Sequence, residues 1–307
     1  MPQGLNSFGL IGFPLEHSRS PAIHTAALAA LGLPGEYRLY LIPPLPAGRE
    51  ELKLLLDRLR EGEINGLNVT IPHKQAVLPF LDSLTSTAQT IVAANTLFMQ
   101  DGRLIGDNTD AAGFMADLNR LAPGVFGSQK IALVLGAGGS ASAIIYALLQ
   151  AGQKVVITAR RLEQALEIVE RFSAGIQPPG SSRQASPDPN LAPSVEISAI
   201  GIESLPDLIS EYASHIGLVV NTTPLGMAPH VQASPWPDDL PFPPKATVYD
   251  LVYNPIETRL VAQASRAGLL AFTGLGMLVE QAALSFERWT GQPAPRLAMF
   301  AAAARGL

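Results

Sequence analysis

The stretch IALVLGAGGSASAIIYALLQAG at residues 131–152 decides the fold. Its first five residues are apolar and predict a buried strand, a glycine-rich turn follows, and the remainder has the length and composition of a helix. A second predicted strand, KVVITARR at residues 154–161, comes directly after it. Because glycine and serine interrupt the uncharged run, the stretch is better explained as a βαβ unit than as a membrane span.

The turn has the sequence that a dinucleotide-binding strand, turn and helix require. Gly136 permits a tight turn, Gly138 lets the backbone approach a pyrophosphate, and Ala141 allows close packing of helix and strand. The exposed amides and the helix dipole would favour a phosphate, although a purely structural turn is the alternative. The predicted cofactor-binding residues of this turn are Gly136, Ala137, Gly138, Gly139, Ser140 and Ala141.

The end of the second strand indicates which dinucleotide binds. Enzymes that use NAD place an acidic residue near the ribose 2′-hydroxyl, whereas this chain has Arg160 and Arg161. A guanidinium can bind a 2′-phosphate through two hydrogen bonds, so we predict NADP as the cofactor. The alternative is a pair of solvated arginines at a helix start, where cations oppose the helix dipole.

Composition excludes several classes of protein. The 307 residues correspond to about two domains, and the net charge of -5 lacks the basic excess of a nucleic-acid-binding protein. The chain has no cysteine, which excludes disulfides and thiolate ligands, and its five histidines lack metal-ligand spacing. We therefore predict no metal site. The N-terminal residues do not have the pattern of a secretory signal, so we expect a cytoplasmic protein.

Strands and helices alternate on both sides of the central stretch. In the first half the pattern predicts strands at residues 7–11, 36–42 and 66–71, and helices at 21–31 and 50–59. In the second half it predicts strands at 195–200, 218–221 and 247–251, and helices at 162–172 and 277–289. This alternation is typical of an α/β fold with a largely parallel sheet. Residues 173–194 are rich in proline, serine and glycine and predict a flexible surface insertion.

Polar residues of the first half suggest a ligand site. Ser18 and Ser20 stand directly before a helix that starts with proline, where both hydroxyls could bind a ligand carboxylate. Capping of the helix by the Ser20 side chain is the alternative. Asn68 and Thr70 share one side of a predicted strand.

Lys74 follows that strand, in the first helical turn after a proline. The helix dipole and any burial would favour its neutral amine, which can accept a proton, although a surface lysine also fits the pattern. Asn95 and the stretch GDNTD at residues 106–110 add further amides, hydroxyls and carboxylates. Turn formation and helix capping by Thr109 or Asp110 would explain part of this second cluster.

Taken together, these motifs resemble the shikimate dehydrogenase family. The resemblance extends over nearly the whole chain and rests on eight stretches. They are SRSP at 18–21, NVTIPHK at 68–74, AANT at 93–96, GDNTDAAGF at 106–114, GAGGSA at 136–141, VVNTTPLGM at 219–227, YDLVYNPIET at 249–258 and GLGMLVEQAA at 274–283.

The resemblance implies two α/β domains with an active-site cleft between them. Residues 1–109 plus 275–307 would form a substrate-binding and catalytic domain with a mixed, mostly parallel sheet, and residues 110–274 a Rossmann-type NADP-binding domain. Lys74 and Asp110 would be the catalytic pair. The substrate-binding residues would be Ser18, Ser20, Asn68, Thr70, Lys74, Asn95, Asp110, Tyr253 and Gln281. Beyond the glycine turn, the cofactor-binding residues would be Arg160, Arg161, Thr223, Gly274 and Met277.

The implied activity is the NADP-dependent, reversible reduction of 3-dehydroshikimate to shikimate, a step of chorismate and aromatic amino acid biosynthesis. The alternatives are a quinate or dual quinate/shikimate dehydrogenase and, more distantly, a non-catalytic NADP-binding sensor. The expected partner is a small-molecule substrate, with no nucleic acid or membrane, and the protein would be a monomer or homodimer. Two departures from the family pattern concern the cofactor: Ala159-Arg160-Arg161 replaces Asn-Arg-Thr, and Ser142 replaces a frequent arginine.

Overall fold

The computed structural model describes residues 5–126, 130–173 and 196–305. The chain divides into two compact units, called unit 1 (Met1–Asp117 with Leu275–Leu307) and unit 2 (Leu118–Gly274), so the boundary falls inside helix α5 (Asp110–Leu121). Of the predicted insertion, only Ser173 belongs to the described residues, as the last residue of a helix, and residues 174–194 lie outside them. Among the described residues, no helix is long and apolar enough to cross a membrane.

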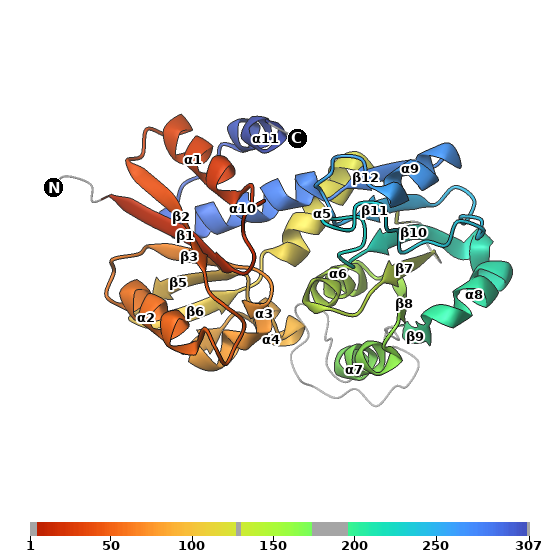
Figure 1. Cartoon of the computed structure of the whole chain (residues 1–307), viewed down its shortest axis with the longest axis horizontal. Coiled ribbons are helices and arrows are strands. Elements are labelled where there is room, and N and C mark those ends of the chain that lie inside the picture. The colour runs from red at the N-terminus through yellow and green to blue at the C-terminus, as the bar shows by residue number, and fades with distance from the viewer. Residues whose placement is uncertain (1–4, 127–129, 174–195, 306–307) are drawn as a thin grey trace, which may run out of the picture. The chain divides into compact units, whose positions relative to one another are not determined.

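Unit 2 contains a six-stranded sheet in the order β12-β11-β10-β7-β8-β9, and every neighbouring pair is parallel (Figure 1). Its strands are β7 (Ile131–Leu135), β8 (Lys154–Ala159), β9 (Ile197–Gly201), β10 (Ile216–Asn221), β11 (Thr247–Asp250) and β12 (Leu270–Thr273). Counted from β7, this order is 6-5-4-1-2-3, the strand order of a dinucleotide-binding Rossmann domain. The predicted βαβ unit is confirmed.

The helices of unit 2 are α6 (Gly139–Gln150), α7 (Leu162–Ser173), α8 (Leu205–Tyr212) and α9 (Arg259–Arg266). Helix α6 begins at Gly139, inside the predicted turn of residues 136–141, because the extended N-cap residue Gly138 leads directly into it. Gly136 has a φ of +110°, which L-residues with a side chain rarely adopt. The tight turn between β7 and α6 therefore depends on this glycine.

Unit 1 contains a mixed six-stranded sheet in the order β2-β1-β3-β5-β6-β4. Its strands are β1 (Asn6–Gly12), β2 (Gly35–Leu41), β3 (Gly66–Val69), β4 (Ser83–Leu84), β5 (Thr96–Gln100) and β6 (Arg103–Asp107). Three neighbouring pairs are parallel, and β5 is antiparallel to both β3 and β6. The β5–β6 hairpin was not predicted from the sequence. Asp101 and Gly102, both with positive φ, form its two-residue turn, a sequence that favours this geometry.

The C-terminal segment returns to unit 1 and completes its core. The helices of this unit are α1 (Ser20–Ala30), α2 (Arg49–Arg60), α3 (His73–Ala76), α4 (Ser86–Ile91), most of α5, α10 (Leu275–Thr290) and α11 (Arg296–Ala304). Figure 1 shows the blue helix α11 beside the red helix α1. On α10, Phe286 is fully buried in a cluster with Phe8, and the Trp289 ring stacks on Phe8 with centroids 4.8 Å apart. The Trp289 indole also covers Gly66, where a β-carbon would collide with it.

We predict that Phe286→Ala lowers the free energy of unfolding of unit 1 by about 3–5 kcal/mol, because it removes a fully buried ring and leaves a cavity. The chain has two tryptophans, Trp236 in unit 2 and Trp289 in unit 1, so a Trp236→Phe background makes fluorescence in urea report on unit 1. Leu297→Ala, at a side chain that is 90% exposed on α11, is the matched control with little expected change. Equal urea midpoints for the two variants would contradict this account of the core.

Candidate active site

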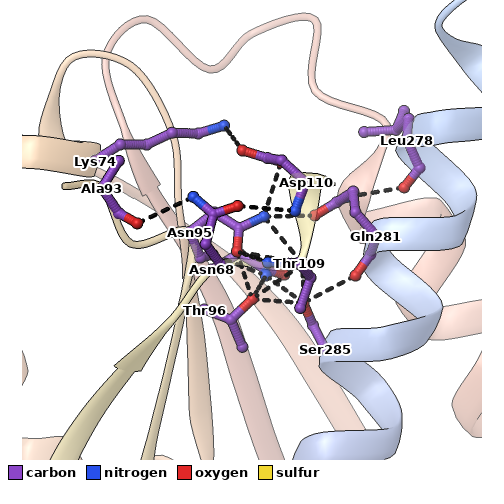
Figure 2. A network of polar contacts seen from close by, with 11 residues as sticks. Asn68, Lys74, Ala93, Asn95, Thr96, Thr109, Asp110, Leu278, Gln281 and Ser285 are labelled. Carbon is purple, nitrogen blue, oxygen red and sulfur yellow. Dashed lines mark hydrogen bonds and ion pairs between the residues drawn. The ribbon is translucent and has the colours of Figure 1, made fainter. Parts of the chain in front are cut away.

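A network of polar side chains lies in unit 1, where the ends of strands β3 and β6 meet the start of β5, α5 and one face of α10 (Figure 2). Its members are Asn68, Lys74, Asn95, Thr96, Thr109, Asp110, Gln281 and Ser285. The sheet register brings the strand ends together, since Thr96 pairs with Asn68 on one side and with Asp107 on the other. Residues far apart in sequence thereby share one buried cluster.

Lys74 and Asp110 form an ion pair at one side of this network. The Lys74 Nζ lies 2.6 Å from Asp110 Oδ2, and the two side chains are 15% and 6% exposed. Lys74 follows β3 on the short helix α3, and its carbonyl oxygen accepts the amide of Ala94 at 2.8 Å. Asp110 is the first residue of α5. The lysine is the more accessible partner, so it is the side of the pair that a ligand can reach more easily.

The orientation of the Asn95 amide follows from one main-chain hydrogen bond. The backbone N–H of Thr109 donates to Asn95 Oδ1 at 2.8 Å, and a backbone N–H can only donate. The other end of the amide, Nδ2, therefore faces Asp110 Oδ1 at 2.8 Å and Gln281 Oε1 at 3.2 Å. Both carboxylate oxygens of Asp110 thus accept hydrogen bonds, one from Lys74 and one from Asn95, as an ionised carboxylate does.

Two further amides are oriented in the same way. Asn68 Nδ2 donates to the main-chain oxygen of Asn95 at 3.1 Å, which leaves Asn68 Oδ1 to accept the Tyr37 hydroxyl at 2.8 Å. Gln281 Nε2 donates to the main-chain oxygen of Leu278 at 2.8 Å, which leaves Oε1 to accept from Asn95. Three side chains that the sequence analysis assigned to substrate are therefore held in single orientations by backbone groups.

Two residues that were not predicted from the sequence are Ser285, a member of the network, and Tyr37, whose hydroxyl donates to Asn68. Ser285 is fully buried on α10, four residues after Gln281 and hence on the same helix face. Its hydroxyl contacts Asn68 Nδ2 at 3.0 Å and Thr96 Oγ1 at 2.7 Å. The i, i+4 spacing from Gln281 was the available signal for Ser285. Nothing in the alternation of β2 distinguishes Tyr37 from an ordinary core residue.

A buried aromatic pair supports Asn68. The His24 and Tyr37 rings stack with centroids 4.3 Å apart and planes at 4°. Burial lowers the pKa of His24 to about 3, so this imidazole is neutral near pH 7. Burial raises the pKa of the Tyr37 phenol, and a hydrogen bond with Ser20 opposes part of this rise. The phenol therefore stays protonated, and its O–H donates a hydrogen bond to Asn68 Oδ1.

Ser18, Ser20 and Thr70 lie at the edge of this arrangement. The predicted alternative, capping of α1 by the Ser20 side chain, is wrong: the N-cap is Arg19, which makes no side-chain cap, and Ser20 is already helical. Instead, Ser18 Oγ accepts the Ser20 amide at 3.3 Å. The Thr70 amide donates to Ile11 at 2.8 Å, and its methyl group lies against Gly12. The structure links Ser20 to the network through a hydrogen bond with Tyr37, and Ser18 is linked to it only through Ser20.

The glycine turn of unit 2 fits a phosphate-bearing cofactor. A β-carbon built on Gly138 or Gly139 meets no atom within 4 Å, so the backbone at the start of α6 faces open space. On its other side the turn is closely packed, since a β-carbon on Gly136 would come within 2.7 Å of Thr222 Oγ1 and 3.0 Å of Thr223 Cγ2. Open main-chain amides at a helix N-terminus are the donor set that a pyrophosphate requires.

The other predicted cofactor residues lie in several places. Arg160 and Arg161 follow β8, both are exposed, and neither pairs with a carboxylate among the described residues. Thr223 follows β10 and donates to Asn221 Oδ1 at 2.7 Å. Gly274 ends unit 2, where its amide donates to Val252 at 3.4 Å. Met277 is buried on α10 in unit 1, and Tyr253, assigned to substrate, is on the loop after β11 in unit 2.

Three family models match the chain. The model of the shikimate dehydrogenase substrate binding domain matches residues 10–97, and that of the shikimate 5'-dehydrogenase C-terminal domain matches residues 274–303. A model of an NADP oxidoreductase, coenzyme F420-dependent, matches residues 130–220. The first two matches lie mainly in unit 1 and the third in unit 2.

Individual proteins resemble the chain over nearly its full length. The shikimate dehydrogenase (NADP(+)) of Brucella melitensis biotype 2 is 39% identical over 294 residues, which cover 95% of this chain and 91% of that protein. The crystal structure of shikimate 5-dehydrogenase from Thermus thermophilus in complex with NADP(H) and shikimate is 36% identical, with a TM-score of 0.80 and coverage of 99% and 100%. Quinate dehydrogenase from Corynebacterium glutamicum in complex with NAD is 30% identical, with a TM-score of 0.81 and coverage of 97% and 98%. The chain belongs to the shikimate dehydrogenase family.

Proposed function

We propose that this protein catalyses the NADP-dependent, reversible reduction of 3-dehydroshikimate to shikimate, a step of aromatic amino acid biosynthesis. The observation that carries the proposal is the Lys74–Asp110 ion pair, whose carboxylate is held by Asn95 within a network of oriented amides. Family membership and the shikimate dehydrogenases among its relatives support the same activity. An intact pair of this kind also argues against a non-catalytic NADP-binding sensor.

Reduction of the ketone adds a hydride to the carbonyl carbon and a proton to its oxygen. NADP, when bound, supplies the hydride chemistry in both directions. The Lys74–Asp110 pair supplies the proton to the developing alkoxide and takes it back in the reverse direction. Asn95 keeps Asp110 beside Lys74 by donating to its second oxygen. The ammonium group of Lys74 uses one N–H on Asp110, which leaves two for the substrate oxygen.

The oriented amides suit a substrate with several ring hydroxyls. Gln281 has one N–H beyond the one given to Leu278, and Asn68 Oδ1 has one lone pair beyond that taken by Tyr37. We assign Asn68, Thr70, Asn95 and Gln281 to the hydroxyls, and Ser18, Ser20 and Tyr253 to the substrate carboxylate. A site built to pair substrate hydroxyls discriminates against analogues that lack one, because its own buried polar groups then stay unpaired.

The cofactor assignment rests on the glycine turn and the two arginines. The open amides at the start of α6 would hold the pyrophosphate, with Thr223 packed against Gly136 of the same turn. Arg160 and Arg161 would hold the ribose 2′-phosphate that distinguishes NADP from NAD. A solved quinate dehydrogenase with NAD is nearly as similar as the shikimate enzymes, so quinate is the second candidate substrate. The two arginines favour the first proposal.

Steady-state assays of the purified protein with shikimate and with quinate, each with NADP and with NAD, test this function. We expect the highest kcat/KM for shikimate with NADP, because the arginines offer a charged partner only to the 2′-phosphate. A higher kcat/KM for quinate with NAD would reverse the order of the two candidates. No turnover with any of the four combinations, in a folded protein that binds NADP, would favour the sensor.

Substitution of either member of the ion pair should abolish most of the activity. We predict that Lys74→Met and Asp110→Asn each lower kcat by a factor on the order of 10²–10⁴, the usual effect of losing a general acid or base. The dissociation constant of NADP, measured by calorimetry, should change little. Lys53→Met, at an exposed lysine on α2, is the matched control. Rates within about tenfold of wild type for both pair variants would rule out the assigned role.

The arginines should determine cofactor preference. We predict that Arg160→Ala combined with Arg161→Ala weakens NADP binding on the order of 10–100-fold, the loss expected for charge-assisted hydrogen bonds, and weakens NAD binding far less. Calorimetric titration with each cofactor measures both constants. Arg266→Ala, at an exposed arginine that ends α9, controls for the net charge of unit 2. Equal losses for NADP and NAD would show that the pair only contributes surface charge.

A further inference from the structure

Unit 2 contains a buried carboxyl group that the proposed mechanism does not use. Asp250 is the last residue of β11 and is fully buried, with no exposed surface. Its Oδ1 accepts Asn221 Nδ2 at 2.8 Å and the Val252 amide at 3.0 Å, and its Oδ2 accepts Thr258 Oγ1 at 2.6 Å. Asn221 is the last residue of β10, and Val252 and Thr258 lie in the segment between β11 and α9.

Asp250 is connected to the loop after β10 through Asn221. The main-chain N–H of Thr223 donates to Asn221 Oδ1 at 2.9 Å, and the Thr223 hydroxyl donates to the same atom at 2.7 Å. Because a backbone N–H can only donate, Asn221 must present its Nδ2 to Asp250. The Asn221 amide therefore connects the Asp250 carboxylate to Thr223, whose methyl group lies against Gly136 in the glycine turn, and Asn221 Nδ2 also donates to the main-chain oxygen of Leu225 at 3.4 Å.

Through Thr258, Asp250 closes the loop after β11. The hydroxyl of Thr258 donates to Asp250 Oδ2 and also accepts the Val261 amide at 3.2 Å as the N-cap of α9. Residues 250 and 258 are thus joined at the base of a loop that contains Tyr253. One carboxylate holds the two loops to which we assign a cofactor residue and a substrate residue.

We propose that Asp250 is a positioning residue, which fixes the Thr223 loop for NADP and the Tyr253 loop for the substrate carboxylate. The inference rests on the proposed function, since it concerns the same two ligands. Burying a carboxylate costs solvation free energy that its hydrogen bonds offset only in part. Stabilisation of the fold alone is therefore a poor explanation for Asp250. Burial raises the pKa of Asp250 to about 6 despite the three hydrogen bonds, and above that pH the ionised group is a pure acceptor for the donors around it.

The first test compares Asp250→Ala with Asp250→Asn at about pH 8, where the carboxyl is ionised. Calorimetry gives the dissociation constant of NADP without substrate, steady-state assays give kcat and the KM of shikimate, and thermal unfolding gives Tm. We expect Asp250→Ala to raise both the NADP constant and the shikimate KM by about tenfold or more. Asp250→Asn keeps an oxygen for Asn221 and Val252, so it should restore NADP binding to within about threefold of wild type.

A second test separates the two loops. Thr258→Val removes the partner of Oδ2 and the N-cap of α9 but leaves Asn221 and Val252 on Oδ1, so it should raise the shikimate KM and leave the NADP dissociation constant within about twofold of wild type. Thr258→Ser restores the hydroxyl and should return the KM to normal. If Asp250→Ala does not fold, the two Thr258 variants and Asp250→Asn still test the proposal. A normal shikimate KM in Thr258→Val would overturn it.

The stability control is Leu205→Ala, a fully buried core position on α8 in the same unit. This variant should lower Tm and leave both ligand constants unchanged. If Asp250→Ala behaves like Leu205→Ala, Asp250 is only structural and the inference fails while the proposed function stands. If the wild-type protein itself shows no NADP-linked oxidation of shikimate, the proposed function fails first, and the NADP constants alone then test the Thr223 loop.

Discussion

The hydrogen bond from the Thr109 main-chain N–H to Asn95 Oδ1 is the constraint on which the rest of the site depends. Because of this bond, Asn95 directs its Nδ2–H group toward Asp110. The amide oxygen of Asn95 in that place would be repelled by the carboxylate. With the amide reversed, Asp110 would lose one donor and Gln281 Oε1 would face another oxygen. The geometry of the Lys74–Asp110 pair is therefore set by a peptide group, whose position is fixed by the β6–α5 connection.

The sheet of each unit gathers its polar groups at the strand ends. In unit 2 the strand order reverses between β7 and β10, so the glycine turn and the Asn221–Thr223 loop leave adjacent strands at the same edge. Ligands of doubly wound folds bind at this switch point. In unit 1 the antiparallel strand β5 also gathers polar residues, because its start places Asn95 and Thr96 between the ends of β3 and β6. Both arrangements are products of topology.

The strongly periodic strands and helices could be predicted from the sequence. The hydrogen-bond partners that only the tertiary structure brings together could not. The βαβ unit and the NADP assignment follow from local pattern, and the resemblance to a family supplied Lys74 with Asp110, which the structure places 2.6 Å apart. The β5–β6 hairpin was not predicted, although Asp101-Gly102 is a typical hairpin turn, because apolar and polar residues alternate only weakly in these short strands. Tyr37 could not be assigned from pattern alone, and the spacing of Ser285 from Gln281 does not reveal its partners, since the two hydroxyls bond residues 31 and 189 positions away.

The two units contain the same hydrogen-bond arrangement, an asparagine between a main-chain N–H and an aspartate, but the two aspartates have different roles. In unit 1 an asparagine accepts the amide of Thr109 and gives its N–H to Asp110, and in unit 2 Asn221 accepts the amide of Thr223 and gives its N–H to Asp250. The third partner separates their roles. Asp110 faces an accessible ammonium group that can exchange a proton with a ligand, whereas Asp250 faces the hydroxyl of a helix cap in a fully buried setting. The first carboxylate is thereby suited to proton transfer, and the second only to holding loops in place.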